Sequence, residues 1–266
     1  GKALLESLPG AGAGAGAVTL PAAPAVAPPP PFEDWAAERA AALARGARPS
    51  AVAATALTSE GVPDVDDLTA GLKKRPLDMD LPPWLKGRYG TAVGRAVHGV
   101  LQTVDLATGA GLDAAVAAQC EAEAIPERAD DVRRLADFAL AAPTVVEAAG
   151  APHWREVYAC APLDGRLLEG YIDLLYRRAA VGLVVVDYKT AATSDPAVLD
   201  RRLYAYRLQG GSYAVAVAAA TGDAVAEVVF VFLTPDGAVE RRLEDLELAV
   251  GEVQALVGAG NEITAD

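Results

Sequence analysis

Apolar residues recur along the chain at two spacings, and the spacing changes near His153. Before that point the spacing is helical and predicts helices over 32–44, 89–106, 112–124 and 129–149. Beyond it, short Val-rich runs predict strands over 153–163, 166–178, 181–191 and 226–233. Further helices are expected over 201–220 and 245–257. Helices followed by strand–strand–strand–helix–strand predict a mixed α/β domain with a small central sheet.

The N-terminal segment differs in composition from the rest of the chain. It contains GAGAGAGA and then a Pro- and Ala-rich run, which cannot bury a core and predicts a flexible linker over 1–31. One domain is expected over 32–266, interrupted by a loop-rich stretch over 58–83 that ends in paired prolines. Because the chain begins without Met, we expect it to be part of a longer protein.

Composition narrows the class of protein. The 266 residues are 52% hydrophobic, which is enough for one large domain with a substantial core. No apolar run is long enough to cross a bilayer, so the sequence predicts a soluble protein without a membrane partner. Two cysteines are too few for a disulfide framework or a four-cysteine metal site. They favour a reducing, intracellular compartment.

The formal net charge of −13 argues against a general polyanion-binding protein. The acidic residues are unevenly placed, however, and far outnumber the basic ones between Ala216 and Asp266. The segment before and within the helix over 89–106 carries Lys86, Arg88 and Arg95 and no acid up to His98. Because the local field decides whether a phosphate can approach, the overall charge does not exclude a phosphate substrate.

Charged residues interrupt the most apolar of the predicted strands. Asp187 and Lys189 are two residues apart and therefore lie on one face, whereas Val184, Val186 and Tyr188 lie on the other. Burying a carboxylate and an ammonium group in a central strand costs several kcal/mol unless the two are paired or bind an ion. An ion pair at a sheet edge is the structural alternative.

A second acid is expected beside this pair. A tight hairpin centred on Ala180 would place Asp173 opposite Asp187, with Cβ atoms about 4.5–5.5 Å apart if no bulge intervenes. Two facing carboxylates repel each other, but with a divalent cation between them the net electrostatic interaction becomes attractive. Glu156 adds a third acid on the neighbouring predicted strand.

Two carboxylates with a nearby lysine suit the hydrolysis of a phosphodiester. That reaction needs a hydroxide generated near neutral pH and compensation of the charge on the transition state and the leaving oxygen. Mg²⁺ bound by oxygen ligands can supply these effects, and a lysine can hold the attacking water or the phosphate. Glycosidases also use paired carboxylates, but the lysine and the scarcity of aromatic residues disfavour a glycosidase. A pure interaction module would leave the buried charges without a role.

Five strings occur in the order GTAVGRAVHGVLQ, REVYA, GYIDLLYR, VVVDYKTA and YRLQGGSYAVA. Together they resemble the RecB- and AddA-like nuclease domain of the PD-(D/E)XK superfamily, the C-terminal domain of UvrD/RecB-type helicase–nucleases. The resemblance spans a catalytic core over about 89–233. It implies a restriction-endonuclease-like fold with extra N-terminal helices, and hydrolysis of DNA.

The resemblance also implies roles for individual residues. Metal ligands for Mg²⁺ or Mn²⁺ would be His98, Asp173, Asp187 and the main-chain carbonyl of Tyr188. Lys189 would be the catalytic cation, and Glu156 a supporting acid of the catalytic set. Considered from the residue alone, His98 on a helix with an apolar face is more often a core histidine, and imidazole suits Mn²⁺ better than Mg²⁺.

A helical motif would support the site and the DNA path. Its members, Tyr206, Gln209 and Tyr213, share one helix face at spacings of three and four residues. Aromatic residues at such spacing usually belong to a core, and a buried Gln209 would then need a hydrogen-bond partner.

The resemblance implies an exonuclease, rather than an endonuclease, in DNA end processing, recombination and repair. Its substrate would be single-stranded DNA or duplex ends, delivered by a helicase domain of the parent chain and a possible partner subunit. The location would be the bacterial cytoplasm, near the nucleoid. Because the four cysteines that hold a cluster in some relatives are missing, we expect no iron–sulfur cluster. A catalytically silent domain that guides DNA or scaffolds a helicase complex is the alternative.

Overall fold

The computed structural model describes residues 31–46, 51–57 and 91–259. Contacts divide the chain into two compact units, 1–48 and 49–266. Helix α2 (Phe32–Gly46) belongs to the first unit and confirms the helix predicted at 32–44. Its assignment to the main domain stays a prediction. The linker over 1–31 and the loop over 58–83 lie, apart from Pro31, outside the described residues.

The second unit follows the predicted order of elements. It contains β1 (Ala51–Ala53), η1 (Ala54–Leu57), α3 (Ala92–Thr103), α4 (Leu112–Ala122), η4 (Pro126–Arg128), α5 (Ala129–Leu140), α6 (Pro143–Ala149), β2 (His153–Leu163), β3 (Arg166–Arg178), β4 (Gly182–Thr190), α7 (Pro196–Thr221), β5 (Val225–Thr234), β6 (Gly237–Arg242) and α8 (Leu246–Ala259). Strand β1 is short and is not predicted by the apolar pattern. Within the described residues, no helix has the length and apolar character that a bilayer crossing requires.

One predicted helix is wrong. The pattern over 129–149 predicts a single helix, but the structure breaks it into α5 and α6. Pro143 occupies the first turn of α6, and Ala142 before it is extended, with φ −64° and ψ 133°. A proline disfavours the helical conformation of the preceding residue and has no N–H to donate, so the chain turns there.

The sheet has six strands in the order β1-β3-β4-β5-β6, with β2 paired to the other side of β3. Strand β3 runs antiparallel to β2 and β4 and parallel to β1. Strands β4 and β5 are parallel and are joined through α7, whereas β5 and β6 form an antiparallel pair. Strands β1 and β4 share one side of β3 at different ends, and neither pairs with residues 170–173.

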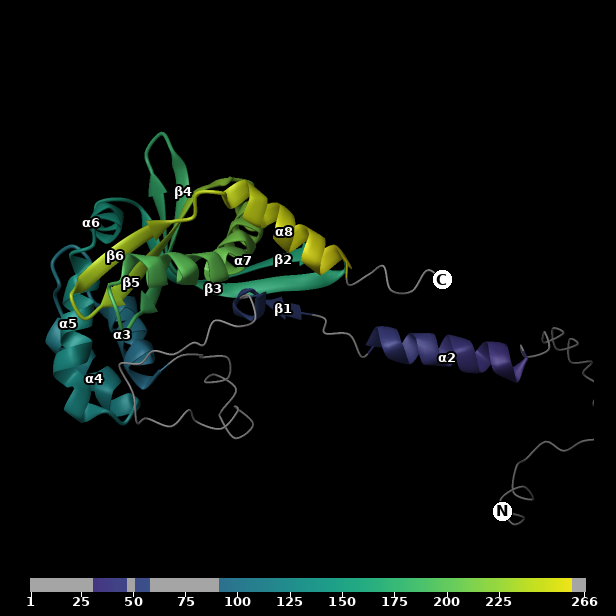
Figure 1. Cartoon of the computed structure of the whole chain (residues 1–266), viewed down its shortest axis with the longest axis horizontal. Coiled ribbons are helices and arrows are strands. Elements are labelled where there is room, and N and C mark those ends of the chain that lie inside the picture. The colour runs from purple at the N-terminus through teal and green to yellow at the C-terminus, as the bar shows by residue number, and fades with distance from the viewer. Residues whose placement is uncertain (1–30, 47–50, 58–90, 260–266) are drawn as a thin grey trace, which may run out of the picture. The chain divides into compact units, whose positions relative to one another are not determined.

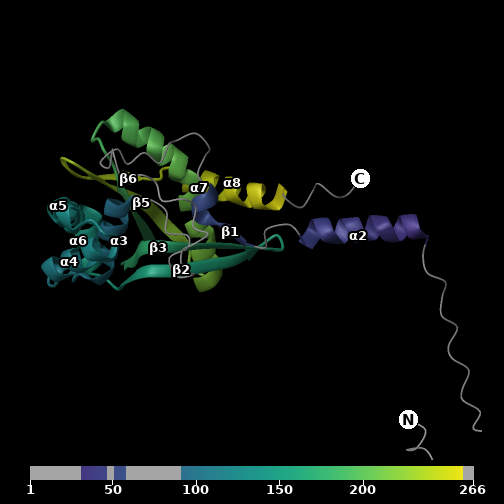
Figure 2. The ribbon, with the colours of Figure 1, turned by 90° about the horizontal axis from the view of Figure 1, so that it is seen from below.

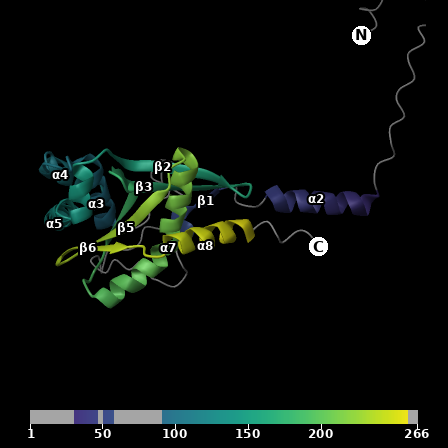
Figure 3. The same cartoon turned by 90° about the horizontal axis from the view of Figure 1, so that it is seen from above.

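Helices cover both faces of the sheet, which confirms the mixed α/β fold. Helices α3, α4 and α5 pack on one face over Val184, Val186 and Tyr188. Helix α7 packs on the other face over Val185, Phe230 and neighbouring residues. The teal helices α3–α6 gather at one end of the β2–β3 hairpin, and the rest of the hairpin extends beyond them (Figures 1, 2 and 3).

Candidate functional site

The β3–β4 hairpin has the predicted register up to the candidate site. Leu174 pairs with Val186 and Arg178 with Gly182, as a turn centred on Ala180 requires. The β3–β4 ladder ends at the Leu174–Val186 pair, so the expected Asp173–Asp187 cross-strand pair is not formed. Instead, the Asp173 carboxylate accepts a hydrogen bond from the backbone N–H of Tyr188, at 2.7 Å. The side chain of Asp173 thus takes the place of a backbone acceptor at the end of the ladder.

At this point the side chains of β2 and β3 switch from one face of the sheet to the other. Ile172 and its partner Val157 pack under α7, whereas Leu174 packs in the cluster of α3. Regular alternation would put Ile172 and Leu174 on the same face. The register of β2 and β3 passes over Glu156 and Asp173, and Glu156 has φ 50°. A left-handed conformation at a residue other than glycine costs roughly 1–3 kcal/mol and is frequent at functional sites.

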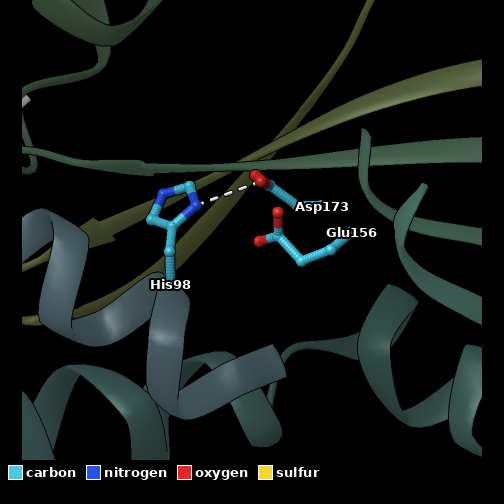
Figure 4. A group of neighbouring side chains, drawn as sticks. All are labelled: His98, Glu156 and Asp173. Carbon is cyan, nitrogen blue, oxygen red and sulfur yellow. Dashed lines mark hydrogen bonds and ion pairs between the residues drawn. The ribbon is translucent and has the colours of Figure 1, made fainter. Parts of the chain in front are cut away.

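Helix α3 brings a histidine to this kink. Thr91 caps the helix by accepting the N–H of Gly94 at 3.0 Å, and Val93, Val97 and Val100 bury one face. His98 points from the helix toward Asp173, with Nδ1 3.0 Å from Oδ1 (Figure 4).

Arg155 ties β2 to the end of the same helix. Its guanidinium donates to the carbonyl oxygens of Leu101 and Val104, at 3.2 and 2.5 Å. The helix that carries His98 is thereby joined to the strand that carries Glu156.

Three side chains meet at the kink. His98, Glu156 and Asp173 each offer a ligand atom, and these atoms lie within 4.8 Å of one another. The three come from α3, β2 and β3 and point toward a common centre (Figure 4). The sequence predicts only a supporting role for Glu156, because the reversal of its backbone leaves no signal in the apolar pattern. The structure places its carboxylate among the candidate ligands.

The charges in this cluster support one another. Burial alone would lower the pKa of His98, but the charge and hydrogen bond of Asp173 outweigh it and raise this pKa to about 9. Burial would raise the pKa of Asp173, but His98, Lys189 and the Tyr188 N–H together hold it below its usual value. A divalent cation bound here would displace the His98 proton, and the ionised carboxylate, the second acid and the neutral imidazole are then donors suited to it.

Asp187 lies in a different environment, on the face covered by α7, and is 2% exposed. Its Oδ1 accepts hydrogen bonds from Gln209 Nε2 at 3.2 Å and from the Tyr213 hydroxyl at 3.3 Å. Gln209 Nε2 also donates to the Tyr213 hydroxyl, at 2.7 Å. The predicted helical motif therefore supplies the partner that a buried Gln209 needs.

Lys189 completes the buried region. Its Nζ lies 2.6 Å from Asp187 Oδ2 and 4.6 Å from the centroid of the Tyr206 ring. Burial would lower the pKa of Lys189, but Asp187 reverses this and holds it above its usual range. Burial raises the pKa of Asp187, and the nearby charge of Asp173 adds to the effect.

The Lys189 ammonium is the partner of the second oxygen of this carboxylate, Asp187 Oδ2. Asp187 Oδ2 is buried and, apart from its ion pair with Lys189, accepts no hydrogen bond of regular geometry among the described residues. A carboxylate oxygen can accept more than one partner, so Asp187 Oδ2 keeps lone-pair capacity for a cation besides Lys189. Together with the three-residue cluster, this oxygen fits a divalent metal.

A predicted site residue, Asp187, and a basic residue near the site, Arg95, have surroundings that the sequence does not indicate. Asp187 is expected beside Asp173 as a ligand, but the structure does not include it in the cluster of three. Arg95, expected to offer positive charge to a phosphate, is engaged with Glu123 at 2.6 Å. Lys86 and Arg88 lie outside the described residues. Metal binding by the Tyr188 carbonyl stays a prediction.

A family model described as the PD-(D/E)XK nuclease superfamily matches residues 76–263, well over half of the chain. A search of curated proteins gave no match. Among solved structures, a proposed exonuclease from Eubacterium rectale is 16% identical over 64% of this chain and 66% of its own, with a TM-score of 0.44. A protein named SSO0001 is also 16% identical, over 64% of this chain and 85% of its own, with a TM-score of 0.33.

Proposed function

The chain belongs to the PD-(D/E)XK nuclease superfamily, and from this premise we propose that it is a metal-dependent deoxyribonuclease. The observation that carries the proposal is the meeting of His98, Glu156 and Asp173 at the strand kink. The buried Asp187–Lys189 pair lies on the neighbouring strand, close enough for its charges to act on His98 and Asp173. Candidate ligands and a fixed cation are the parts that phosphodiester hydrolysis requires.

We assign the metal to Asp173, Glu156 and His98, with Asp187 Oδ2 as a further oxygen ligand. Carboxylate oxygens suit Mg²⁺ and Mn²⁺, and the imidazole favours Mn²⁺ of the two. A bound divalent ion would lower the pKa of water and compensate the negative charge of the transition state. The Tyr188 carbonyl is an additional proposed ligand.

The protein's own residues hold the reacting groups. Lys189 stays protonated because Asp187 raises its pKa, so it acts as a cation toward the phosphate or the attacking water, not as a base. Gln209 and Tyr213 fix Oδ1 of Asp187, which leaves Oδ2 directed at Lys189 and would leave it free to bind a metal as well. The Tyr206 ring lies against the ammonium and limits its movement.

The biological setting is also proposed. We infer an exonuclease module of a helicase–nuclease that processes DNA ends in recombination and repair, in the bacterial cytoplasm. The acidity of the chain supports this setting, because a net charge of −13 makes unaided capture of DNA unfavourable and favours delivery by a motor.

The first test is degradation of end-labelled single-stranded DNA with Mg²⁺ or Mn²⁺, and with EDTA. We expect wild type to cut only with metal and Asp187→Asn to be inactive. Asp113→Asn is the matched control, because this aspartate lies on α4 with an 84% exposed side chain. Equal cutting by wild type and Asp187→Asn would reject the proposed mechanism. Tight DNA binding without cutting, in wild type and in the full parent chain, would favour the silent scaffold.

A second substrate separates exonuclease from endonuclease. Circular single-stranded DNA has no end, so an exonuclease leaves it intact while degrading a linear strand of the same sequence. Loss of the circular form at the rate of the linear form would show an endonuclease.

A further inference from the structure

Two tyrosines lie side by side on the outer surface of the β2–β3 hairpin. Tyr158 and Tyr171 are cross-strand partners, and their ring centroids are 5.2 Å apart at an interplanar angle of 48°. They are 49% and 62% exposed, so the pair presents aromatic surface to solvent. Cross-strand aromatic pairs stabilise hairpins, but that role does not require such exposure.

The pair lies next to the candidate ligands. Tyr158 follows Glu156 by two residues on β2, and Tyr171 precedes Asp173 by two on β3, a separation of about 7 Å along a strand. Val157 and Ile172, which lie between, point under α7, so both tyrosines point to the opposite face. This is the face to which α3 brings His98. The hairpin runs beyond α3–α6 (Figures 2 and 3), and the exposure of both rings shows that these helices do not cover them.

The tyrosine pair is held in place and is uncharged. The Tyr158 hydroxyl donates to Glu169 at 2.6 Å, which fixes the position of its ring, and a phenol is neutral near neutral pH. Glu169 lies on β3 opposite Cys160, so the next cross-strand pair brings an acid and no cation. A phosphate is disfavoured beside that acid. The flat, uncharged face of a base is compatible with it.

We propose that Tyr158 and Tyr171 form a stacking platform for an unpaired base of the DNA strand that is cut at the neighbouring site. The proposal rests on the nuclease function proposed above and deepens it, because it selects single-stranded over duplex DNA. In a duplex each base is stacked and paired, so its face is not open to a side chain. Aromatic stacking of this kind tolerates any base sequence.

The test compares two strands with the same phosphates. One is fluorescently labelled oligothymidylate, and the other is a run of abasic residues of equal length. Anisotropy in EDTA measures binding without cleavage. We expect wild type to bind the thymidylate strand roughly 10-fold more tightly than the abasic strand, the size of one base stack. Equal affinity for the two strands would reject the platform without any variant.

The variants localise the effect. Tyr171→Val keeps a strand-forming residue at an exposed position and should weaken thymidylate binding roughly 10-fold, with abasic binding unchanged. Tyr171→Phe keeps the ring and should bind like wild type. A Tyr171→Val protein that binds both strands like wild type but still cuts DNA would overturn the platform and leave the nuclease proposal standing. If thymidylate binding depends on the Tyr171 ring but the protein never cuts DNA, the platform would stand and the nuclease proposal would be overturned.

Discussion

Asp173 and Asp187 lie on neighbouring strands of one sheet, yet their surroundings differ in almost every respect. Asp173 is at the kink of β2 and β3, facing α3, beside a histidine whose side chain is 31% exposed. Asp187 is on a regular stretch of β4 facing α7, where Gln209, Tyr213 and Lys189 enclose it. We call the surroundings of Asp173 the open region, because the side chain of its histidine is 31% exposed, and those of Asp187, whose side chain is 3% exposed, the buried region.

This difference suggests a division of labour across the sheet. The open region collects ligand atoms from separate elements and keeps them reachable, with a strained backbone at Glu156 as the consequence. The buried region fixes a charged pair whose geometry does not depend on solvent. A metal joined to both regions would connect two parts that differ in stability, and this can be tested.

The largest expected effect separates the two aspartates by stability. Asp187→Asn and Asp173→Asn should each lower the cleavage rate about 1000-fold, the loss of one group that stabilises the transition state. Asp187→Asn should also lower the free energy of unfolding by about 3 kcal/mol, because it leaves the Lys189 ammonium, whose side chain is only 18% exposed, without its counter-charge. At a pH above 9, where His98 is uncharged, Asp173→Asn should lower it by about 1 kcal/mol or less, since Asn can still accept the Tyr188 N–H.

Urea unfolding in EDTA measures both values without a contribution from metal. Equal destabilisation by the two substitutions would mean that the two regions do not differ in the way their burial indicates.

The next effect concerns metal removal. At a metal concentration 100 times its dissociation constant, binding should raise the free energy of unfolding of wild type by about 2.7 kcal/mol. EDTA should reverse the gain and abolish cleavage. His98→Ala should lose most of the gain because it removes one ligand of the open region. Gln209→Leu, in the buried region, should keep most of it. Thermal unfolding at increasing Mn²⁺ concentration measures this gain in stability. An undiminished gain in His98→Ala would show that the metal binds elsewhere.

The regular parts of the molecule follow from sequence, and the kink does not. The Val-rich β4 and the hairpin centred on Ala180 have the predicted register, because strand alternation and turn position set them. The breakdown at Asp173 depends on a left-handed Glu156 and on a side chain that replaces a ladder bond. Neither has a signature in the spacing of apolar residues.

The same contrast applies to the site residues. The chemistry of the buried pair can be predicted, because a carboxylate and a lysine two apart in an apolar strand are costly to bury unless they pair or bind an ion. The role of Gln209 follows from its helical spacing and its need for a partner, and its contact with Asp187 supplies that partner. The convergence of Glu156 on His98 depends on tertiary packing between β2 and α3, which one sequence does not reveal.

A smaller effect is expected from the residues that hold Asp187. Gln209→Leu and Tyr213→Phe should each lower kcat about 10- to 100-fold with little change in KM, because they orient the carboxylate without touching DNA. Gly170→Ala should have a similar effect, since the added Cβ would lie 2.9 Å from the Tyr213 ring. Steady-state kinetics on a single-stranded oligonucleotide separates kcat from KM. A rise in KM alone would indicate that this helix face binds DNA directly.

The smallest expected effect tests the tie within the open region. Arg155→Lys removes the guanidinium Nη1 that donates to the Leu101 and Val104 carbonyls, and should lower the free energy of unfolding by about 1 kcal/mol. It should also weaken Mn²⁺ binding a few-fold, because the helix of His98 is no longer fixed to the strand of Glu156. Arg177→Lys is the control, since its ion pair with Asp223 is exposed and contributes about 0–1 kcal/mol. Isothermal titration with Mn²⁺ measures the affinities. If both variants bind Mn²⁺ like wild type, the ligands of the open region are positioned by the strand kink alone and not by the helix contact.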